Sequence, residues 1–77
     1  MRFTKQMAFN LNALLDREKW ALAVEVAADA FAERNKIERT NLGFCKIRDA
    51  HRRRVRGEGS PAECDQACKE VADSVGG

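Results

Sequence analysis

The chain has 77 residues, of which 44% are hydrophobic and 34% charged, with a formal net charge of +2. This length fits one domain and excludes two, so we expect a single domain over residues 1–77. The composition is that of a globular protein and excludes a disordered one. A membrane span needs about 20 mostly apolar residues, whereas the longest uncharged stretch, residues 6–15, is short. We therefore predict a cytoplasmic protein that does not enter a membrane.

The first predicted helix covers residues 2–15. Its apolar face consists of residues spaced four, four and three apart, namely Phe3, Met7, Leu11 and Leu14. Asp16 has a side-chain oxygen suited to capping a following helix. We therefore expect a break at Asp16, which would be the N-cap of the second helix.

The second predicted helix covers residues 17–34 and contains the most apolar run of the chain. The stripe expected to face the core is Trp20, Val24, Ala27 and Phe31. The acidic residues expected to face solvent on the opposite side are Glu25, Asp29 and Glu33. We predict that truncating Trp20 or Phe31 to alanine costs about 3–5 kcal/mol, as for other core residues. Asn35 is the expected left-handed stop.

The third predicted helix covers residues 41–56, with Thr40 as its cap and Gly57 after its end. Its inward side is expected to hold Phe44, Ile47, His51 and Val55. Gly43 weakens the first turn, because glycine costs up to about 1 kcal/mol relative to alanine inside a helix.

The fourth predicted helix has the clearest start signal. Ser60 is an N-cap serine, Pro61 occupies the first helical position, and Glu63 follows three residues after the cap. Its apolar stripe is Cys64, Cys68, Val71 and Val75. None of four such short helices could bury its apolar face alone, so the sequence predicts an all-α fold, a small compact bundle of about four helices.

Charge is strongly segregated along the chain. Residues 39–57 carry seven basic residues against one acidic residue, a net charge of +6, and residues 58–77 carry one basic against five acidic residues, a net charge of −4. Exposed ion pairs with the acidic segment are one interpretation, and such pairs are worth about 0–1 kcal/mol each. The other interpretation is a docking surface in which the arginines face water, since guanidinium groups suit carboxylates and phosphates. The predicted partner-binding residues are Lys46, Arg48, Arg52, Arg53, Arg54 and Arg56.

Two kinds of partner fit such a surface. The arginines could contact a nucleic acid along its phosphate backbone. The overall charge of the chain is low for this role, however, and no exposed aromatic residue is interleaved with the arginines for base stacking. An acidic or nucleic-acid-binding surface on a protein explains the arginines equally well. We expect a monomer, with self-association through exposed apolar surface near Phe3 and Met7 as a weaker alternative.

Catalytic and metal chemistry find little support in the residues. His51 is the single histidine and lies on an apolar stripe, where a packed side chain is the ordinary case. Together with Cys45, Cys64 and Cys68 it could supply four zinc ligands, but the C-x₂-C spacing of zinc sites is absent. Core thiols are the simpler interpretation, and a disulfide from Cys45 to one of the other two needs an oxidising compartment. We predict no enzyme and no cofactor.

In size, helical make-up and lack of catalytic motifs, the chain resembles the small inhibitors encoded by phages and mobile elements, in particular type I anti-CRISPR proteins of the I-C group. These proteins share no motif, so the resemblance assigns no residue a role. It implies stoichiometric binding to a Cascade effector complex that blocks target DNA. The leading expectation is thus a non-catalytic protein-binding inhibitor, and the alternative is a small nucleic-acid-binding regulator that uses the third helix.

Overall fold

The computed structural model describes residues 3–75, which form four α-helices and no strand. The helices are α1 (Lys5–Asp16), α2 (Ala21–Asn35), α3 (Leu42–Val55) and α4 (Pro61–Val75). The predicted all-α bundle is confirmed. Within the described residues, no helix is both long enough and apolar enough to cross a membrane.

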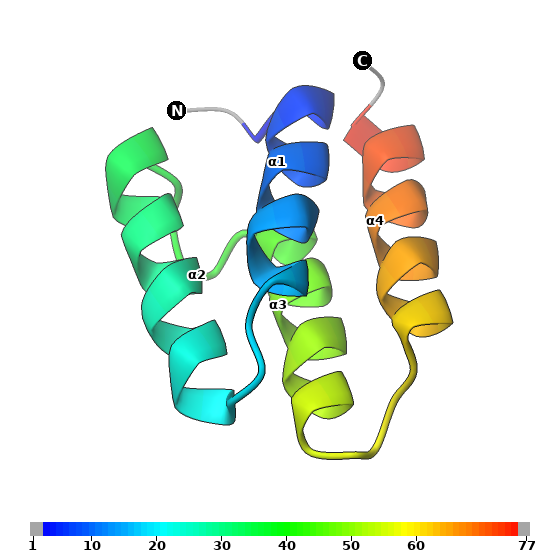
Figure 1. Ribbon diagram of the computed structural model, residues 1–77. Helices are drawn as coiled ribbons and strands as arrows, with labels where there is room; N and C mark the ends of the chain where they lie inside the picture. The colour runs from blue at the N-terminus through cyan, green and yellow to red at the C-terminus, as the bar shows by residue number, and fades with distance from the viewer. Residues whose placement is uncertain (1–2, 76–77) are drawn as a thin grey trace.

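Successive helices run in opposite directions, so that α2 begins at the end of the bundle where α3 finishes (Figure 1). Helices α1, α3 and α4 pack against one another, whereas α2 packs on α1 and α3 without contacting α4. Figure 1 shows α2 at one edge of the bundle and α4 at the other. No other helix of the described chain therefore covers the outer face of α2.

The core lies between α1, α3 and α4 and extends under α2. Its largest fully buried apolar side chains are Leu11 and Leu15 of α1, Val24 of α2, and Phe44 and Ile47 of α3. Of the stripe predicted for the fourth helix, Cys64, Cys68 and Val71 are buried, and Val75 is half-buried against the core.

The helix ends follow local capping chemistry, although several caps differ from those predicted. Thr4 begins α1, with the Met7 amide donating to Thr4 Oγ1 at 3.1 Å; residue 2, included in the first predicted helix, lies outside the described residues. Asn41 rather than Thr40 caps α3, and its side chain accepts from the Phe44 amide at 3.1 Å. Asparagine is the stronger capping residue, which accounts for the difference.

The predicted caps at both ends of α2 are wrong. Asp16 is the last residue of α1, and α2 begins after Trp20, whose side chain makes no capping hydrogen bond. At the other end Lys36, not Asn35, adopts the left-handed conformation, with φ 54°. The Ile37 amide then donates to Ala32 O at 2.8 Å, and Ile37 is buried. A buried residue after a left-handed one is typical of a Schellman motif, in which the buried contact offsets the cost of placing a lysine where glycine is usual.

The predicted start of α4 is confirmed. The Glu63 amide donates to Ser60 Oγ at 3.3 Å and Pro61 is the first helical residue. At the preceding turn Gly57 has φ 78°, and the Glu58 amide donates to Arg53 O at 2.8 Å. Because that conformation is unstrained only for glycine, Gly57 fixes the path from α3 to α4.

Gly43 has a packing role that the sequence does not reveal. A Cβ atom there would lie 2.9 Å from Val71 Cγ1 and 3.2 Å from Phe3 Cδ1. The first turn of α3 therefore approaches α4 closely, and Phe3 is buried at this contact. Phe3 is thus unavailable for the self-association surface that the sequence suggested near Phe3 and Met7.

The inward face of α2 also differs from the prediction. Its buried residues are Val24, Ala28 and Ala32, which are four apart. Trp20, expected in the core, is 74% exposed, and Phe31 is half-buried against the core. Small residues on the inner side let α2 pack closely on α1 and α3, and the larger apolar residues then lie outside.

Candidate functional site

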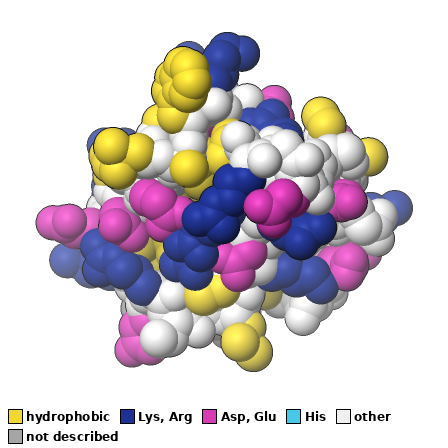
Figure 2. Space-filling model, turned by 90° about the horizontal axis from the view of Figure 1, so that it is seen from below, with side chains coloured by type: hydrophobic (Ala, Val, Ile, Leu, Met, Phe, Trp, Pro, Cys, Tyr) yellow, Lys and Arg dark blue, Asp and Glu magenta, His cyan; other side chains and the backbone are white. Residues whose placement is uncertain are grey.

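The basic helix α3 packs against all three other helices, and most of its cationic side chains have partners on them. The six residues predicted to bind a partner are therefore not one uniform free surface. Over the end of the bundle where α3 finishes, basic and acidic side chains alternate (Figure 2). The expectation that these guanidinium groups face water without intramolecular partners is wrong for most of them.

Arg52 connects α3 to α2. Its Nε and Nη2 atoms donate to the two carboxylate oxygens of Glu25, the latter at 2.6 Å, and Nη1 donates to Asp49 at 3.0 Å. The arginine and Glu25 side chains are only 27% and 35% exposed. The hydrogen bonds from Arg52 lower the pKa of Glu25 and raise the pKa of Arg52. Glu25 was expected to face solvent and instead forms part of this interface.

Arg54 connects α3 to the end of α1. Its Nη1 donates to Asp16 Oδ1 at 3.1 Å, and its Nη2 donates to the carbonyl oxygens of Leu15 at 3.3 Å and Glu18 at 3.0 Å. Its side chain is 17% exposed. Because the last carbonyls of a helix have no amide donor in a following turn of that helix, Arg54 supplies a donor at the C-terminus of α1 and links it to the turn into α2.

The remaining paired residues are more exposed or have weaker contacts. Lys46 binds Glu70 of α4 at 2.8 Å and lowers its pKa through this hydrogen bond. Arg48 lies over the Phe44 ring, 5.5 Å from its centroid, and within 3.3 Å of Asp49.

Arg53 and Arg56 differ from the other four. Arg53 donates to Glu58 O at 3.0 Å, but its nearest carboxylate, on Glu63, is 3.9 Å away and both side chains are more than half exposed. Arg56 is exposed, and its guanidinium group has no hydrogen bond or ion pair among residues 3–75. Arg56 also contributes, through its charge, to the lowered pKa of Glu25. These two arginines are the predicted site residues that make no ion pair shorter than 3.9 Å among residues 3–75.

Sequence reasoning missed an exposed apolar group on α2. Trp20 is 74% exposed, Leu22 75% and Val26 60%. The continuous apolarity of this helix hides which side faces inward, since Val24, Ala28 and Ala32 recur every four residues and so do Leu22, Val26 and Ala30. Side-chain size could have indicated the inward side, because the series Val24, Ala28 and Ala32 has the smaller side chains and allows closer helix packing.

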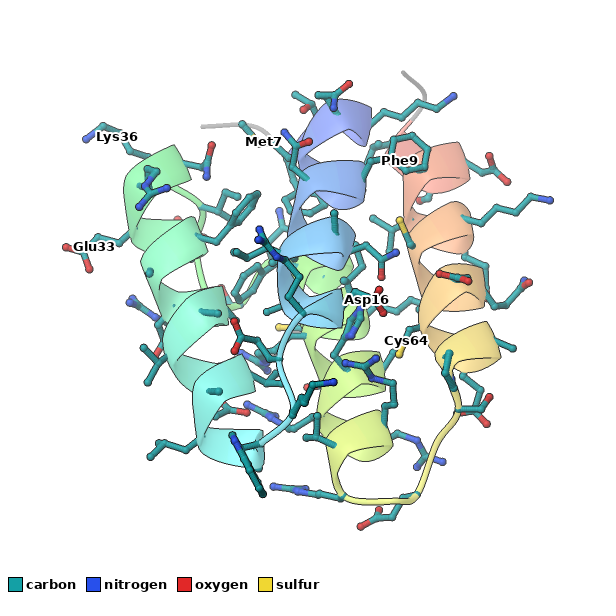
Figure 3. The ribbon with its side chains drawn as sticks, viewed as in Figure 1. Met7, Phe9, Asp16, Glu33, Lys36 and Cys64 are labelled. Atoms are coloured by element: carbon teal, nitrogen blue, oxygen red, sulfur yellow. The ribbon has the colours of Figure 1, made fainter. Side chains whose placement is uncertain are left out.

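His51 and the three cysteines are interior or half-buried groups. His51 is fully buried, and its Nε2 lies 2.6 Å from Asn12 Oδ1, so that the neutral ring donates from Nε2. Its Nδ1 has no partner among the described residues. Burial lowers the pKa of His51 and raises those of Cys64 and Cys68. Figure 3 shows Cys64 in the first turn of α4.

All three thiols are free, and within residues 3–75 no group of three His, Cys, Asp or Glu side chains could hold a metal ion. The four potential zinc ligands therefore do not converge. A scan against protein-family models, a search of curated proteins and a search of solved structures each found no match to this chain.

Proposed function

We propose that this protein is a non-catalytic protein-binding inhibitor or regulator that docks through the end of the bundle where α2 begins and α3 finishes. The observation that carries the proposal is the presence at this end of Trp20, 74% exposed, and Arg56, whose guanidinium group has no partner among residues 3–75. Tryptophan and arginine are the residue types that contribute most at protein interfaces. We call this surface, formed by Trp20, Arg53 and Arg56, the Trp20–Arg56 end.

The chemistry of this end favours a partner that presents an apolar pocket beside a carboxylate. Trp20 supplies the apolar group. Arg56 supplies a positive charge that forms no ion pair with a carboxylate among residues 3–75, so docking breaks no such pair. Arg53 has only its long contact with Glu63, and exposed pairs of this kind are worth little, so Arg53 can exchange this partner for an external one. The other cations of α3 hold the bundle together and stay in place during docking.

The resemblance to small phage inhibitors gives the proposal a specific form. The target would be a type I CRISPR effector complex in the host cytoplasm, bound stoichiometrically so that target DNA is excluded. The Trp20–Arg56 end would then occupy an acidic or DNA-binding patch of that complex.

The alternating charges at this end count against the other candidate, a nucleic-acid-binding regulator (Figure 2). A protein that contacts phosphates loses affinity steeply with salt, with a log–log slope of about −0.9 for each phosphate contacted on B-DNA. We expect no gel shift of duplex DNA at low salt, and a salt-dependent shift would favour the regulator.

The docking surface is tested by two matched double variants. The test variant combines Trp20→Ala with Arg56→Glu. The control combines Phe9→Ala with Arg34→Glu, which change an exposed aromatic residue of α1 on the α4 side and an arginine in the last turn of α2 (Figure 3). Both are assayed by affinity capture with quantitative mass spectrometry and by phage plaquing in a bacterium with an active type I-C CRISPR system.

We expect the wild-type protein and the control to capture the effector complex and restore plaquing, and the test variant to do neither. A test variant that retains full activity would overturn the proposed surface. A wild-type protein that does not alter plaquing would exclude the CRISPR target, and the capture experiment would still decide whether the Trp20–Arg56 end docks on protein.

A further inference from the structure

The outer face of α2 carries an apolar stripe that no helix of the described chain covers. Leu22 and Val26 are 75% and 60% exposed, and Ala30, one turn further, is also exposed. Residues four apart form a ridge along a helix, and such ridges pack into the grooves of a second helix. Because α2 contacts only α1 and α3, this ridge points away from the bundle.

One exposed charged residue lies beyond each end of the stripe. Lys19 lies in the link just before α2, three residues before Leu22, and Glu33 lies within α2, three residues after Ala30. Both are exposed, and neither forms a salt bridge with another residue among 3–75. Figure 3 shows Glu33 pointing outward from α2, away from the other three helices. In chain order the positions are Lys19, Leu22, Val26, Ala30 and Glu33, so that Val26 is at the centre and the two opposite charges are at the ends.

We infer that the outer face of α2 binds the same face of a second copy of this chain, with the two helices antiparallel. A two-fold axis at Val26 places each valine against its counterpart and each Leu22 against the small Ala30 of the partner. The same axis brings Lys19 toward Glu33 of the partner at both ends. A two-fold interface requires a surface complementary to itself, and this stripe meets that requirement in size and in charge.

The helix dipoles add to this arrangement, since each positive N-terminus lies beside the negative C-terminus of the other α2. The buried surface is small, so we expect a dissociation constant on the order of tens to hundreds of micromolar. Such a dimer would differ from the monomer predicted from the sequence. It does not depend on the proposed function, because Trp20 and Arg56 lie outside the stripe, and the antiparallel pairing would direct the two Trp20–Arg56 ends in opposite directions.

The inference is tested by sedimentation equilibrium at protein concentrations from about 10 μM to 1 mM, a range chosen to bracket the expected dissociation constant. Val26→Glu places two carboxylates at the axis, and we expect it to weaken the dimer about 100-fold or more. The matched control is Leu42→Glu, which introduces the same charge at a leucine of α3 that is 86% exposed. It should leave the dissociation constant unchanged. Helical circular dichroism checks that both variants are folded.

The antiparallel register has its own test. Lys19→Glu should weaken the dimer by about tenfold, and the double variant Lys19→Glu with Glu33→Lys should restore it, since the exchange recreates both pairs. A wild-type protein that is monomeric at 1 mM would overturn the inference. A dimer that survives Val26→Glu, or one that the charge exchange does not restore, would overturn the interface or its register. Partner capture by the Trp20–Arg56 end is measured in a separate experiment, so a negative result there would not affect the dimer, and a monomer here would not affect the proposed function.

Discussion

Arg52 of α3 and Glu25 of α2, 27 residues apart in the sequence, form a two-pronged ion pair across the interface between their helices. Two parallel N–H···O bonds fix the relative orientation of the two groups as well as attracting them. Both side chains are at least partly shielded from water. The pair therefore sets how α2 lies on α3.

The same principle extends around α3. Arg52 reaches α2, Arg54 reaches the end of α1, and Lys46 reaches α4. A concentration of arginines that resembles a docking surface in the sequence is thus, for the most part, the set of contacts that joins the central helix to its neighbours. Arg56 is the exception, and it lies at the end where Trp20 is exposed.

The first prediction separates Trp20 from the core. Trp20→Ala should change the free energy of unfolding by no more than about 0.5 kcal/mol, because the side chain is mostly in water. Phe44→Ala, at a fully buried position, should cost about 3–5 kcal/mol. Urea denaturation followed by circular dichroism measures both. A large loss of stability in Trp20→Ala would mean that the indole packs on the protein.

A second prediction concerns Arg54, which donates to the Asp16 carboxylate and to the carbonyl oxygens of Leu15, Asp16 and Glu18. Arg54→Lys keeps the charge but cannot reproduce a fork of donors directed at several oxygens. We expect a loss of about 1–3 kcal/mol and faster amide hydrogen exchange in residues 17–20, which Arg54 holds. Arg34→Lys, in the exposed last turn of α2, is the control. Equal stability and equal exchange in the two variants would contradict the role assigned to Arg54.

The third prediction is a pH dependence from His51. Burial, followed by the charge of Arg54, lowers its pKa in the folded state below the ordinary 6.5. The unfolded chain therefore binds a proton first, so stability is fully present above pH 6.5 and declines as the pH falls through the folded pKa. Glu25, with a lowered pKa, contributes stability that is lost only below about pH 4.5.

Urea denaturation at pH 7.5 and pH 5.5 measures the contribution of His51 to the free energy of unfolding, because it is the only histidine in the chain. The wild-type protein should be less stable at pH 5.5. His51→Gln removes the titrating group, and its stability should depend much less on pH over this interval. A variant with the wild-type pH dependence would assign the effect to another group.

A fourth prediction concerns the thiols. Cys64 and Cys68 are buried and their pKa values are raised by burial, whereas Cys45 is half-buried and donates to Arg39 O at 3.0 Å. Since the thiolate is the reactive form, one thiol should react quickly with a disulfide reagent and two should react only as the protein opens. Mass spectrometry should locate the first modification on Cys45. Rapid modification of Cys64 or Cys68 would contradict their burial.

Local signals account for what the sequence predicts well. The number of helices and the start of α4 depend on residues close in the chain, such as Ser60, whose side chain accepts from the Glu63 amide within one turn. Of the apolar face predicted for the first helix, Leu11 is fully buried and Phe3 is buried just before α1 begins. The fully buried Leu15 replaces Leu14 as the deepest residue of the last turn.

Long-range contacts determine the features that the sequence does not predict. The partners of Arg52 and Arg54 lie 27 and 38 residues away, and no local pattern specifies them. In α2, apolar residues surround the helix, so the inward side is decided by which residues allow close packing. For this reason the apolar pattern predicts Trp20 in the core and does not predict that Val26 is exposed.

The most direct test of this account is the melting temperature of two charge reversals in α3. Arg52→Glu places a carboxylate against Glu25, and it should lower the melting temperature by roughly 4–8 °C for each kcal/mol lost, with recovery when Glu25→Arg is added. Arg56→Glu should leave the melting temperature nearly unchanged. Equal melting temperatures for Arg52→Glu and the wild-type protein would contradict the claim that these arginines hold the bundle together.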